Sequence, residues 1–101
     1  MPARIQPDKQ RLNDFCRRYH IRRLAVSGSI VRGDFRPESD VDVLIEFDPD
    51  HRPGMVGLQE IEEGLSGFYD GHRIDLLNPK YLNPRLRDRL LRDAEVVFAE
   101  R

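Results

Sequence analysis

Cysteine and long apolar stretches are the scarcest features of this sequence. Its 101 residues include one cysteine, Cys16. A single cysteine excludes an internal disulfide and a cysteine-based zinc site. No apolar run approaches the roughly 18 residues that a membrane-spanning helix requires, and residues 1–8 lack the apolar centre of a signal peptide. We therefore expect a soluble cytoplasmic protein with no membrane-bound part.

The chain carries enough apolar material for one domain. Hydrophobic residues make up 39% of the sequence and charged residues 35%. A chain of this length buries about two-thirds of its unfolded surface, which provides one modest core. The sequence contains no repeat, no low-complexity tract and no linker. We predict a single domain over residues 1–101.

The charges are unevenly distributed, although the formal net charge is only -1. Residues 1–36 contain nine Lys/Arg against three Asp/Glu, whereas residues 37–75 contain eleven Asp/Glu against two Lys/Arg. Residues 76–101 are mildly basic, with six Lys/Arg against four Asp/Glu. An acidic block beside basic flanks is consistent with a solvated surface. It is equally consistent with a metal site placed next to a phosphate site.

Apolar periodicity predicts the secondary structure. Apolar residues at helical spacing follow Asp8, which can cap a helix. Apolar residues at every second position mark the clearest strand, at 41–47, whose other face carries Asp40, Asp42, Leu44 and Glu46. The predicted elements are helices over 8–19, over 58–68 and from 83 onward, and strands over 22–27, 41–47, 72–77 and 96–99. This order predicts an α/β fold (α+β in some schemes), a small mixed sheet of about four strands with helices packed against it.

The predicted helix over 58–68 contains two glycines, Gly64 and Gly67. Each is expected to weaken the helix by about 1 kcal/mol relative to alanine.

Two residues directly after a strand, Gly28 and Ser29, form a candidate anion site. Glycine lets the backbone approach a ligand closely, and a helical turn that follows would present free N–H groups. The serine adds a hydroxyl donor. An ordinary turn explains the same dipeptide.

Three carboxylates form a candidate metal site. Asp40 and Asp42 project from one face of the predicted strand, and Asp75 interrupts another apolar strand. Neighbouring carboxylates are costly unless a positive group joins them, and Mg²⁺ prefers oxygen ligands. The competing interpretation is a set of solvated carboxylates or salt bridges, with Arg32 or Arg36 as partners.

The order and spacing of these features are more specific than each feature alone. Ten residues separate Gly28-Ser29 from Asp40-Val41-Asp42. This pattern resembles the signature of the DNA polymerase β-like nucleotidyltransferase superfamily, and most closely its minimal nucleotidyltransferase (MNT) domains. The dense match covers about 20 residues, and a weaker one continues through Asp75 to the C-terminus. The resemblance implies the nucleotidyltransferase fold.

The resemblance also implies nucleotide-binding residues. Gly28 and Ser29 would hold the triphosphate of ATP, the expected substrate. Arg32 and Ser39 match positions beside the phosphates, and Arg36 is a further candidate.

The carboxylates match the catalytic positions of the superfamily. Asp40 and Asp42 would bind two divalent metals, expected to be Mg²⁺. Asp75 would bind the catalytic metal and help to activate the attacking hydroxyl. The implied reaction transfers AMP from ATP to a hydroxyl and releases pyrophosphate.

Two positions depart from the pattern of the superfamily. Val31 is bulkier than the alanine common in this loop, and the stretch 67–72 before the third strand is longer than expected. The second departure leaves the register of Asp75 open.

The short chain predicts that the acceptor is presented by another molecule. Stand-alone MNT proteins are typically paired with a HEPN RNase toxin in toxin–antitoxin modules. The resemblance therefore implies an antitoxin that transfers AMP to a tyrosine of a HEPN toxin. Two alternatives stay open: an antitoxin that neutralises its partner by binding alone, and a nucleotidyltransferase that acts on a small molecule or RNA, with a homodimer completing the acceptor site.

The remaining candidates have ordinary interpretations. Cys16 lies on an apolar helix face and is expected in the core. The three histidines lack metal-ligand spacing. The arginines of 85–92 predict a solvated helix face, so direct nucleic-acid binding is not expected.

Overall fold

The computed structural model describes residues 5–33 and 36–100, and for Ser29 and Arg32 it describes the backbone only. Each predicted helix and strand is present, with small shifts at the ends. None of the helices in the described chain is long and apolar enough to cross a membrane. The elements are α1 (Lys9–Arg18), β1 (Ile21–Ser27), α2 (Ser29–Arg32), β2 (Val41–Phe47), α3 (Met55–Phe68), β3 (Ile74–Leu77), the 3-10 helix η1 (Pro79–Tyr81), α4 (Pro84–Arg92) and β4 (Glu95–Ala99).

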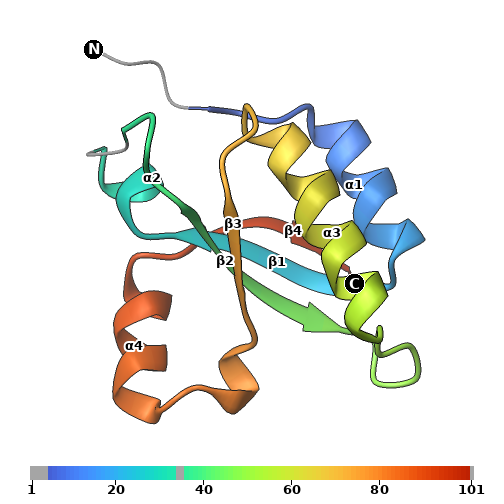
Figure 1. Ribbon diagram of the computed structural model, residues 1–101. Helices are drawn as coiled ribbons and strands as arrows, with labels where there is room; N and C mark the ends of the chain where they lie inside the picture. The colour runs from blue at the N-terminus through green and yellow to red at the C-terminus, as the bar shows by residue number, and fades with distance from the viewer. Residues whose placement is uncertain (1–4, 34–35, 101) are drawn as a thin grey trace.

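The strands form one mixed sheet in the order β3-β2-β1-β4. β1 pairs antiparallel with β2 and β4, whereas β2 and β3 are parallel. The helix α3 makes the crossover between the two parallel strands. Figure 1 shows α1 and α3 side by side, with α4 lying apart from them toward the opposite side of the sheet. The predicted α/β fold with a small mixed sheet is confirmed.

The core lies between the sheet and the two helices α1 and α3. Val41, Val43 and Ile45 alternate along β2 and are at most 2% exposed, which confirms the predicted apolar face of this strand. The same cluster contains Leu12 and Cys16 from α1 and Ile61 and Leu65 from α3. One layer of helices therefore covers the apolar face of the sheet and leaves the face with Asp42 for other contacts.

The predicted helix ends follow ordinary capping chemistry. The side chain of Asp8 accepts a hydrogen bond from the Arg11 N–H at 3.0 Å, as expected for the residue that caps α1. Asn83 caps α4 in the same way, and Pro84 occupies the first helical position. On the sheet face opposite the core, Ser27 Oγ donates to the Leu90 carbonyl of α4 at 3.0 Å. This bond attaches α4 to the sheet directly beside the predicted site.

Cys16 is a core residue, as predicted. Its side chain is fully buried, and desolvation raises the pKa of the thiol to about 12. Because the thiolate is the reactive form, Cys16 is not a nucleophile near neutral pH.

The helix α3 contains three glycines, and two of them, Gly64 and Gly67, differ in their surroundings. A Cβ at Gly64 would lie 2.7 Å from Cζ of Phe15 and closer still to Cε2. The Phe15 ring is confined by Tyr19 and Phe68, with centroid distances of 4.8 and 5.6 Å. A Cβ at Gly67 would meet nothing within 4 Å. Close contact between α1 and α3 therefore requires glycine at position 64 only.

Alanine at the two positions should change stability in opposite directions. Gly67→Ala should raise the free energy of unfolding by up to about 1 kcal/mol, because alanine is the better helix former. Gly64→Ala should lower it by about 1–3 kcal/mol, because overpacking against Phe15 outweighs that gain. Urea denaturation followed by circular dichroism measures both changes. A stabilising Gly64→Ala would contradict the close contact between the helices.

Candidate active site

The candidate carboxylates lie where β2 and β3 begin. In the sheet register Asp42 pairs with Ser27 of β1 on one side and with Asp75 of β3 on the other. Directly paired residues of neighbouring strands lie about 4.8 Å apart and project to the same face. Asp40 immediately precedes β2, two residues before Asp42. The structure therefore brings Asp42 and Asp75 together, and the long stretch 67–72 does not shift Asp75 out of register.

Gly28 fits tightly against the central carboxylate. Its φ of +81° lies in the left-handed region, and a Cβ there would lie 2.6 Å from Oδ2 of Asp42. Only glycine adopts this backbone conformation freely and leaves room for the carboxylate. The two motifs that the sequence separates by ten residues are thus one packed unit. The side chains of Ser29 and Arg32, predicted to contact phosphate, lie outside the described part of the structure.

A tight turn over 36–39 precedes Asp40. The Ser39 N–H donates to the Arg36 carbonyl at 2.9 Å, and the Arg36 N–H donates to Ser39 Oγ at 3.0 Å. The Ser39 side chain therefore closes the turn that leads into β2. Its predicted position beside a phosphate stays a prediction.

His72 connects this turn to the start of β3, and the sequence did not identify it. Its Nδ1 lies 2.9 Å from the Ser39 carbonyl, which requires Nδ1 to carry the proton. The His72 carbonyl in turn accepts a 2.7 Å hydrogen bond from Ser66 Oγ of α3. The next residue, Arg73, accepts from the Val41 N–H at 2.8 Å. These bonds link α3, β3 and the turn before β2, the segments that position Asp40 and Asp75.

The three carboxylates suit a hard cation by their donor chemistry, because Mg²⁺ takes oxygen ligands and keeps several waters. Asp42 is half-buried between two strands, whereas Asp40 and Asp75 are exposed. Within residues 5–33 and 36–100, no three His, Cys, Asp or Glu side chains are close enough to hold a metal. The metal site of Asp40, Asp42 and Asp75 therefore stays a prediction.

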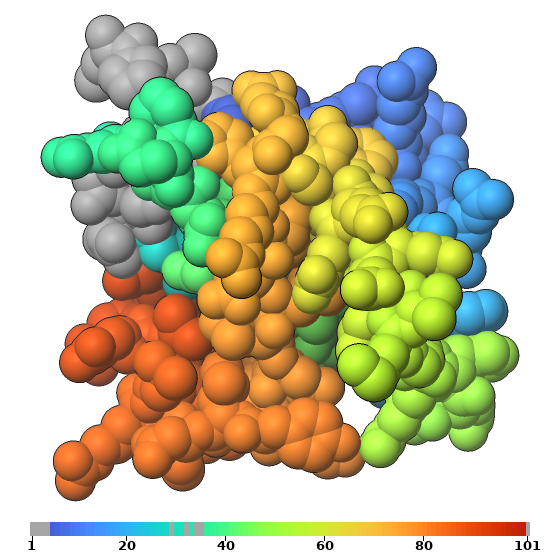
Figure 2. Space-filling model, in the orientation of Figure 1, coloured from blue at the N-terminus to red at the C-terminus, as the bar shows by residue number. Residues whose placement is uncertain are grey.

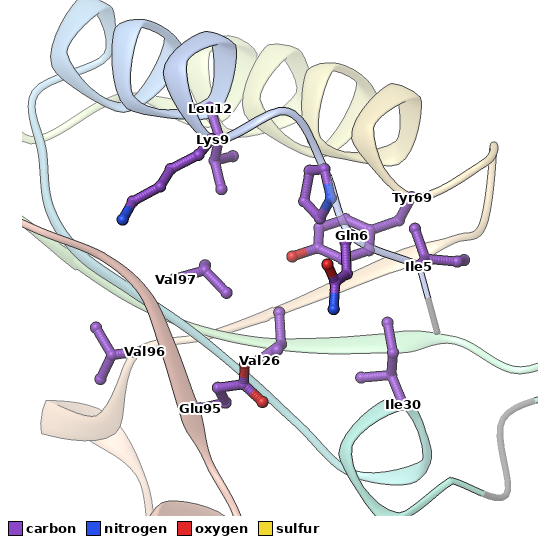
Figure 3. Close-up of a pocket in the computed structure, with 11 residues that line it drawn as sticks. Ile5, Gln6, Lys9, Leu12, Val26, Ile30, Tyr69, Glu95, Val96 and Val97 are labelled. Atoms are coloured by element: carbon purple, nitrogen blue, oxygen red, sulfur yellow. The ribbon is translucent and has the colours of Figure 1, made fainter. Parts of the chain in front are cut away.

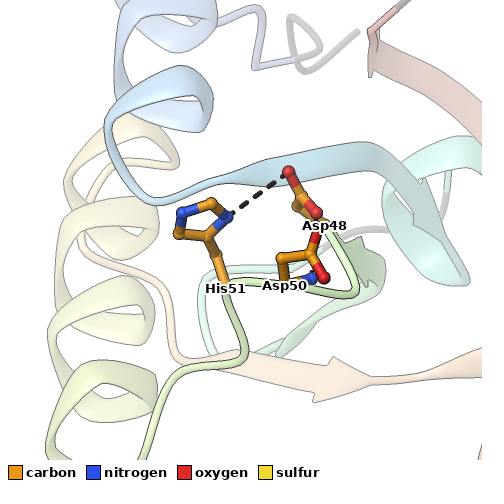
Figure 4. A network of polar contacts seen from close by, with 3 residues as sticks. All are labelled: Asp48, Asp50 and His51. Atoms are coloured by element: carbon orange, nitrogen blue, oxygen red, sulfur yellow. Dashed lines mark hydrogen bonds and ion pairs between the residues drawn. The ribbon is translucent and has the colours of Figure 1, made fainter.

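A second polar cluster lies beyond the opposite end of β2 (Figure 4). Asp48 is 3.4 Å from His51 Nδ1, and the His51 ring stacks on His20 at 3.9 Å between centroids. The Asp50 N–H and then His51 hold the pKa of Asp48 below its ordinary value. These groups are separated from the candidate carboxylates by the length of the strand, so they form a distinct surface feature.

A cavity of about 270 Å³ opens beside the free edge of β4 (Figure 3). Its walls are mainly apolar and include Leu12, Val26 and Ile30. Lys9 and Glu95 supply charges at its rim. Among the predicted site residues whose side chains the structure describes, none lines this cavity, and we interpret it as a gap in the core packing.

Comparison with known proteins relates this chain to nucleotidyltransferases in both sequence and structure. The sequence matches the family model of the nucleotidyltransferase domain over residues 9–97. It is 36% identical over 81 residues to the protein adenylyltransferase MntA of Thermococcus cleftensis, across 80% of this chain and 77% of that protein. A solved structure described as a minimal nucleotidyltransferase superposes with a TM-score of 0.70 at 31% identity, covering 86% of each chain.

A more distant solved structure shares the fold. It is the complex of a tri-AMPylated HEPN toxin from Shewanella oneidensis with an MNT antitoxin. The match has a TM-score of 0.61 at 12% identity and covers 91% of this chain and 70% of that chain. At this identity the likeness shows the fold alone.

The contact between Gly28 and Asp42 predicts an unusual sensitivity to a single methyl group. Gly28→Ala should lower the free energy of unfolding by about 2–5 kcal/mol, from left-handed strain and the clash with Asp42. Gly71→Ala is the matched control, because Gly71 has the same φ of +81° and nothing within 4 Å of a Cβ. It should cost only the strain, about 1–2 kcal/mol. Equal losses in thermal or urea unfolding would contradict the packing of Asp42 on Gly28.

The hydrogen bond from His72 predicts a local effect on β2. His72→Leu should lower the free energy of unfolding by about 1 kcal/mol, because the Ser39 carbonyl loses a donor. His72→Asn should cost less, since the asparagine amide can replace Nδ1–H. Amide hydrogen exchange at Val41 reports the local opening, which should increase in the leucine variant.

The control for this effect is His51→Leu, which removes an exposed histidine at the other end of β2. It should leave the exchange of the Val41 amide unchanged. Equal exchange in the two His72 variants would mean that Nδ1 does not hold the turn.

Proposed function

This chain belongs to the nucleotidyltransferase domain family, and from that premise we propose that it is the antitoxin of a toxin–antitoxin pair, transferring AMP from ATP to a tyrosine of a HEPN RNase toxin. The observation that carries the proposal is the packed unit of Gly28, Asp42 and Asp75. It brings a close backbone approach for phosphate next to two carboxylates in register. The protein adenylyltransferase at 36% identity supports AMP as the transferred group.

The chemistry divides among residues of this chain. Gly28, Ser29, Arg32 and Ser39 bind and orient the triphosphate. Asp40, Asp42 and Asp75 would hold Mg²⁺. When bound, the ions would stabilise the negative charge that develops on the phosphoryl group and on the pyrophosphate that leaves.

The acceptor reacts from the side of Asp75. The hydroxyl oxygen forms a bond to the α-phosphorus, and the bond from that phosphorus to the bridging oxygen breaks to release pyrophosphate. The exposed carboxylate of Asp75 accepts the proton of the hydroxyl. Its position on the edge strand leaves room for another molecule to approach.

The partner assignment rests on the relatives. The HEPN toxin in the Shewanella complex carries AMP groups and is bound to an MNT antitoxin with this fold. We transfer that relationship to this chain as a proposal. The adjacent gene provides a direct check, since it should encode a helical protein of the HEPN type.

Charge removal at the site tests the proposal. With Mg-ATP and the adjacent-gene protein, the wild-type chain should yield a partner heavier by AMP in intact mass spectrometry. The double variant Asp40→Asn, Asp42→Asn keeps the side-chain volumes and removes both charges. It should lower the rate of AMP transfer at least about 100-fold. Asp14→Ala, which removes an exposed carboxylate of α1, is the control and should react normally.

The same samples separate catalysis from binding alone. If the doubly substituted protein still suppresses the toxic RNase activity as well as the wild type does, neutralisation occurs by masking. If it transfers AMP at the wild-type rate, the assignment of Asp40 and Asp42 is wrong.

A further inference from the structure

A groove of about 510 Å³ lies between the start of α3 and η1. It opens where β3 leaves the sheet, because the pairing of β3 with β2 ends at Leu44 and Leu77. Figure 2 shows the hollow between the orange segment of η1 and the lime segment before α3. Apolar side chains form most of its walls: Ile45, Phe47, Pro53, Leu58, Leu76 and Tyr81.

The three most exposed large apolar side chains among the described residues lie in the wall of this groove or in the segment next to it. Tyr81 lines it and is 68% exposed. Met55 and Val56, which are 86% and 70% exposed, lie on the first turn of α3 between the lining residues Pro53 and Leu58. An exposed apolar surface of this kind, rimmed by charges, marks a site of interaction with another molecule.

The groove is continuous with the candidate active site along β3. Glu62 of α3 lines both the groove and a second depression of about 380 Å³. The second depression is bordered by Asp75, by Arg73 immediately before β3 and by Glu63 of α3. A molecule bound in the groove therefore reaches the proposed catalytic carboxylate without crossing the sheet.

Along the edge strand β3, successive residues face the carboxylates and the groove alternately. In the described sheet β3 pairs with β2 only, so its other edge is open. Asp75 pairs with Asp42, whereas the next residue, Leu76, lines the groove beside α3. Adjacent residues of a strand point to opposite faces. An extended chain laid along β3 would present successive side chains to the carboxylates and to the groove in turn.

We propose that the surface between α3 and β3 binds an extended segment of the acceptor protein, with the reacting hydroxyl opposite Asp75 and a large apolar side chain directly beside it in the groove. The inference rests on the proposed AMP transfer and adds the form in which the acceptor is recognised. Edge strands commonly bind peptides in this way, through backbone hydrogen bonds and alternate side-chain pockets.

The charges favour one class of segment. Near Asp75 the surface is acidic, since Glu62 and Glu63 outnumber Arg73. At the far end of the groove Arg52 donates to the Tyr81 hydroxyl at 3.4 Å, and Lys80 lies 5.9 Å from the centre of its ring. The segment should therefore carry basic residues near the hydroxyl and acidic residues beyond the apolar side chain.

Synthetic peptides test the alternation. Each peptide has a central tyrosine in a glycine and serine background. One set carries leucine directly before or after the tyrosine, and the matched set carries it two positions away. With Mg-ATP, at least one peptide of the first set should be modified with a KM about tenfold lower than both peptides of the second set.

Substitution of a residue that lines the groove provides a second test of the inference. Tyr81→Ser should raise the KM of the preferred peptide about fivefold to tenfold and leave kcat unchanged. Leu86→Ser, at another exposed apolar residue, is the matched control and should change neither constant. Equal KM values for the two peptide sets would overturn the inference. So would a KM of the preferred peptide that Tyr81→Ser leaves unchanged. Neither result would contradict AMP transfer itself.

A binding measurement separates this inference from the proposed function. The same peptides with phenylalanine in place of tyrosine cannot react, and fluorescence anisotropy reports their affinity for the wild-type protein. The adjacent-residue set should again bind about tenfold more tightly, and Tyr81→Ser should abolish the difference. If AMP transfer is absent but the adjacent-residue peptides still bind more tightly, only the proposed chemistry is refuted. If the two peptide sets bind equally, only the proposed binding of the acceptor in the groove is refuted.

Discussion

The pairing of β2 on both sides is the constraint on which the core and the candidate site depend. Its inner residues, among them Val43, fill the core, while Asp42 on its other face lies between Ser27 and Asp75. A shift of one residue would place the carboxylates in the core and the valines in water. The large apolar area on one face therefore fixes the position of the polar chemistry on the other. Stability and function use the same register.

Much of the fold follows from patterns that are local in sequence. The strand over 41–47 was predicted with its observed bounds, because every second residue from Val41 to Phe47 is apolar, although Leu44 adds an apolar residue to the other face. The caps Asp8 and Asn83 marked helix starts for the same local reason. Strand β3 is shorter than predicted, since His72 uses its side chain and carbonyl for contacts outside the sheet.

The features that the sequence could not supply are long-range contacts. The bond between His72 and Ser39 joins residues 33 positions apart and leaves no periodic trace. The need for glycine at position 64 arises from Phe15 of another helix. In contrast, Gly28, Asp40, Asp42 and Asp75 were recognisable as candidates because their spacing resembles that of a known superfamily. The roles assigned to these residues still depend on that resemblance. The packing of Gly28 on Asp42 gives a physical reason why glycine stands at position 28.

The acidic block of the sequence separates into different surfaces in the fold. Asp40, Asp42 and Asp75 lie where β2 and β3 begin, and Asp48 lies beyond the other end of β2 beside His51. The carboxylates of Glu62 and Glu63 border the depression next to Asp75. Ionised carboxylates that border one surface repel one another, at a cost that increases when a second protein covers them. A bound cation would remove that cost.

Asp75 lies on an edge strand, whereas the other candidate residues lie on or next to the interior strands of the sheet. The strands β1 and β2, next to which the nucleotide would bind, are interior to the sheet and paired on both sides. Asp75 shares their register through Asp42 but belongs to a strand whose outer edge is open. In the proposed reaction the doubly paired strands would position the phosphate groups, and the open edge of β3 would admit a large acceptor. A covered edge would leave Asp75 beyond the reach of a hydroxyl of another protein.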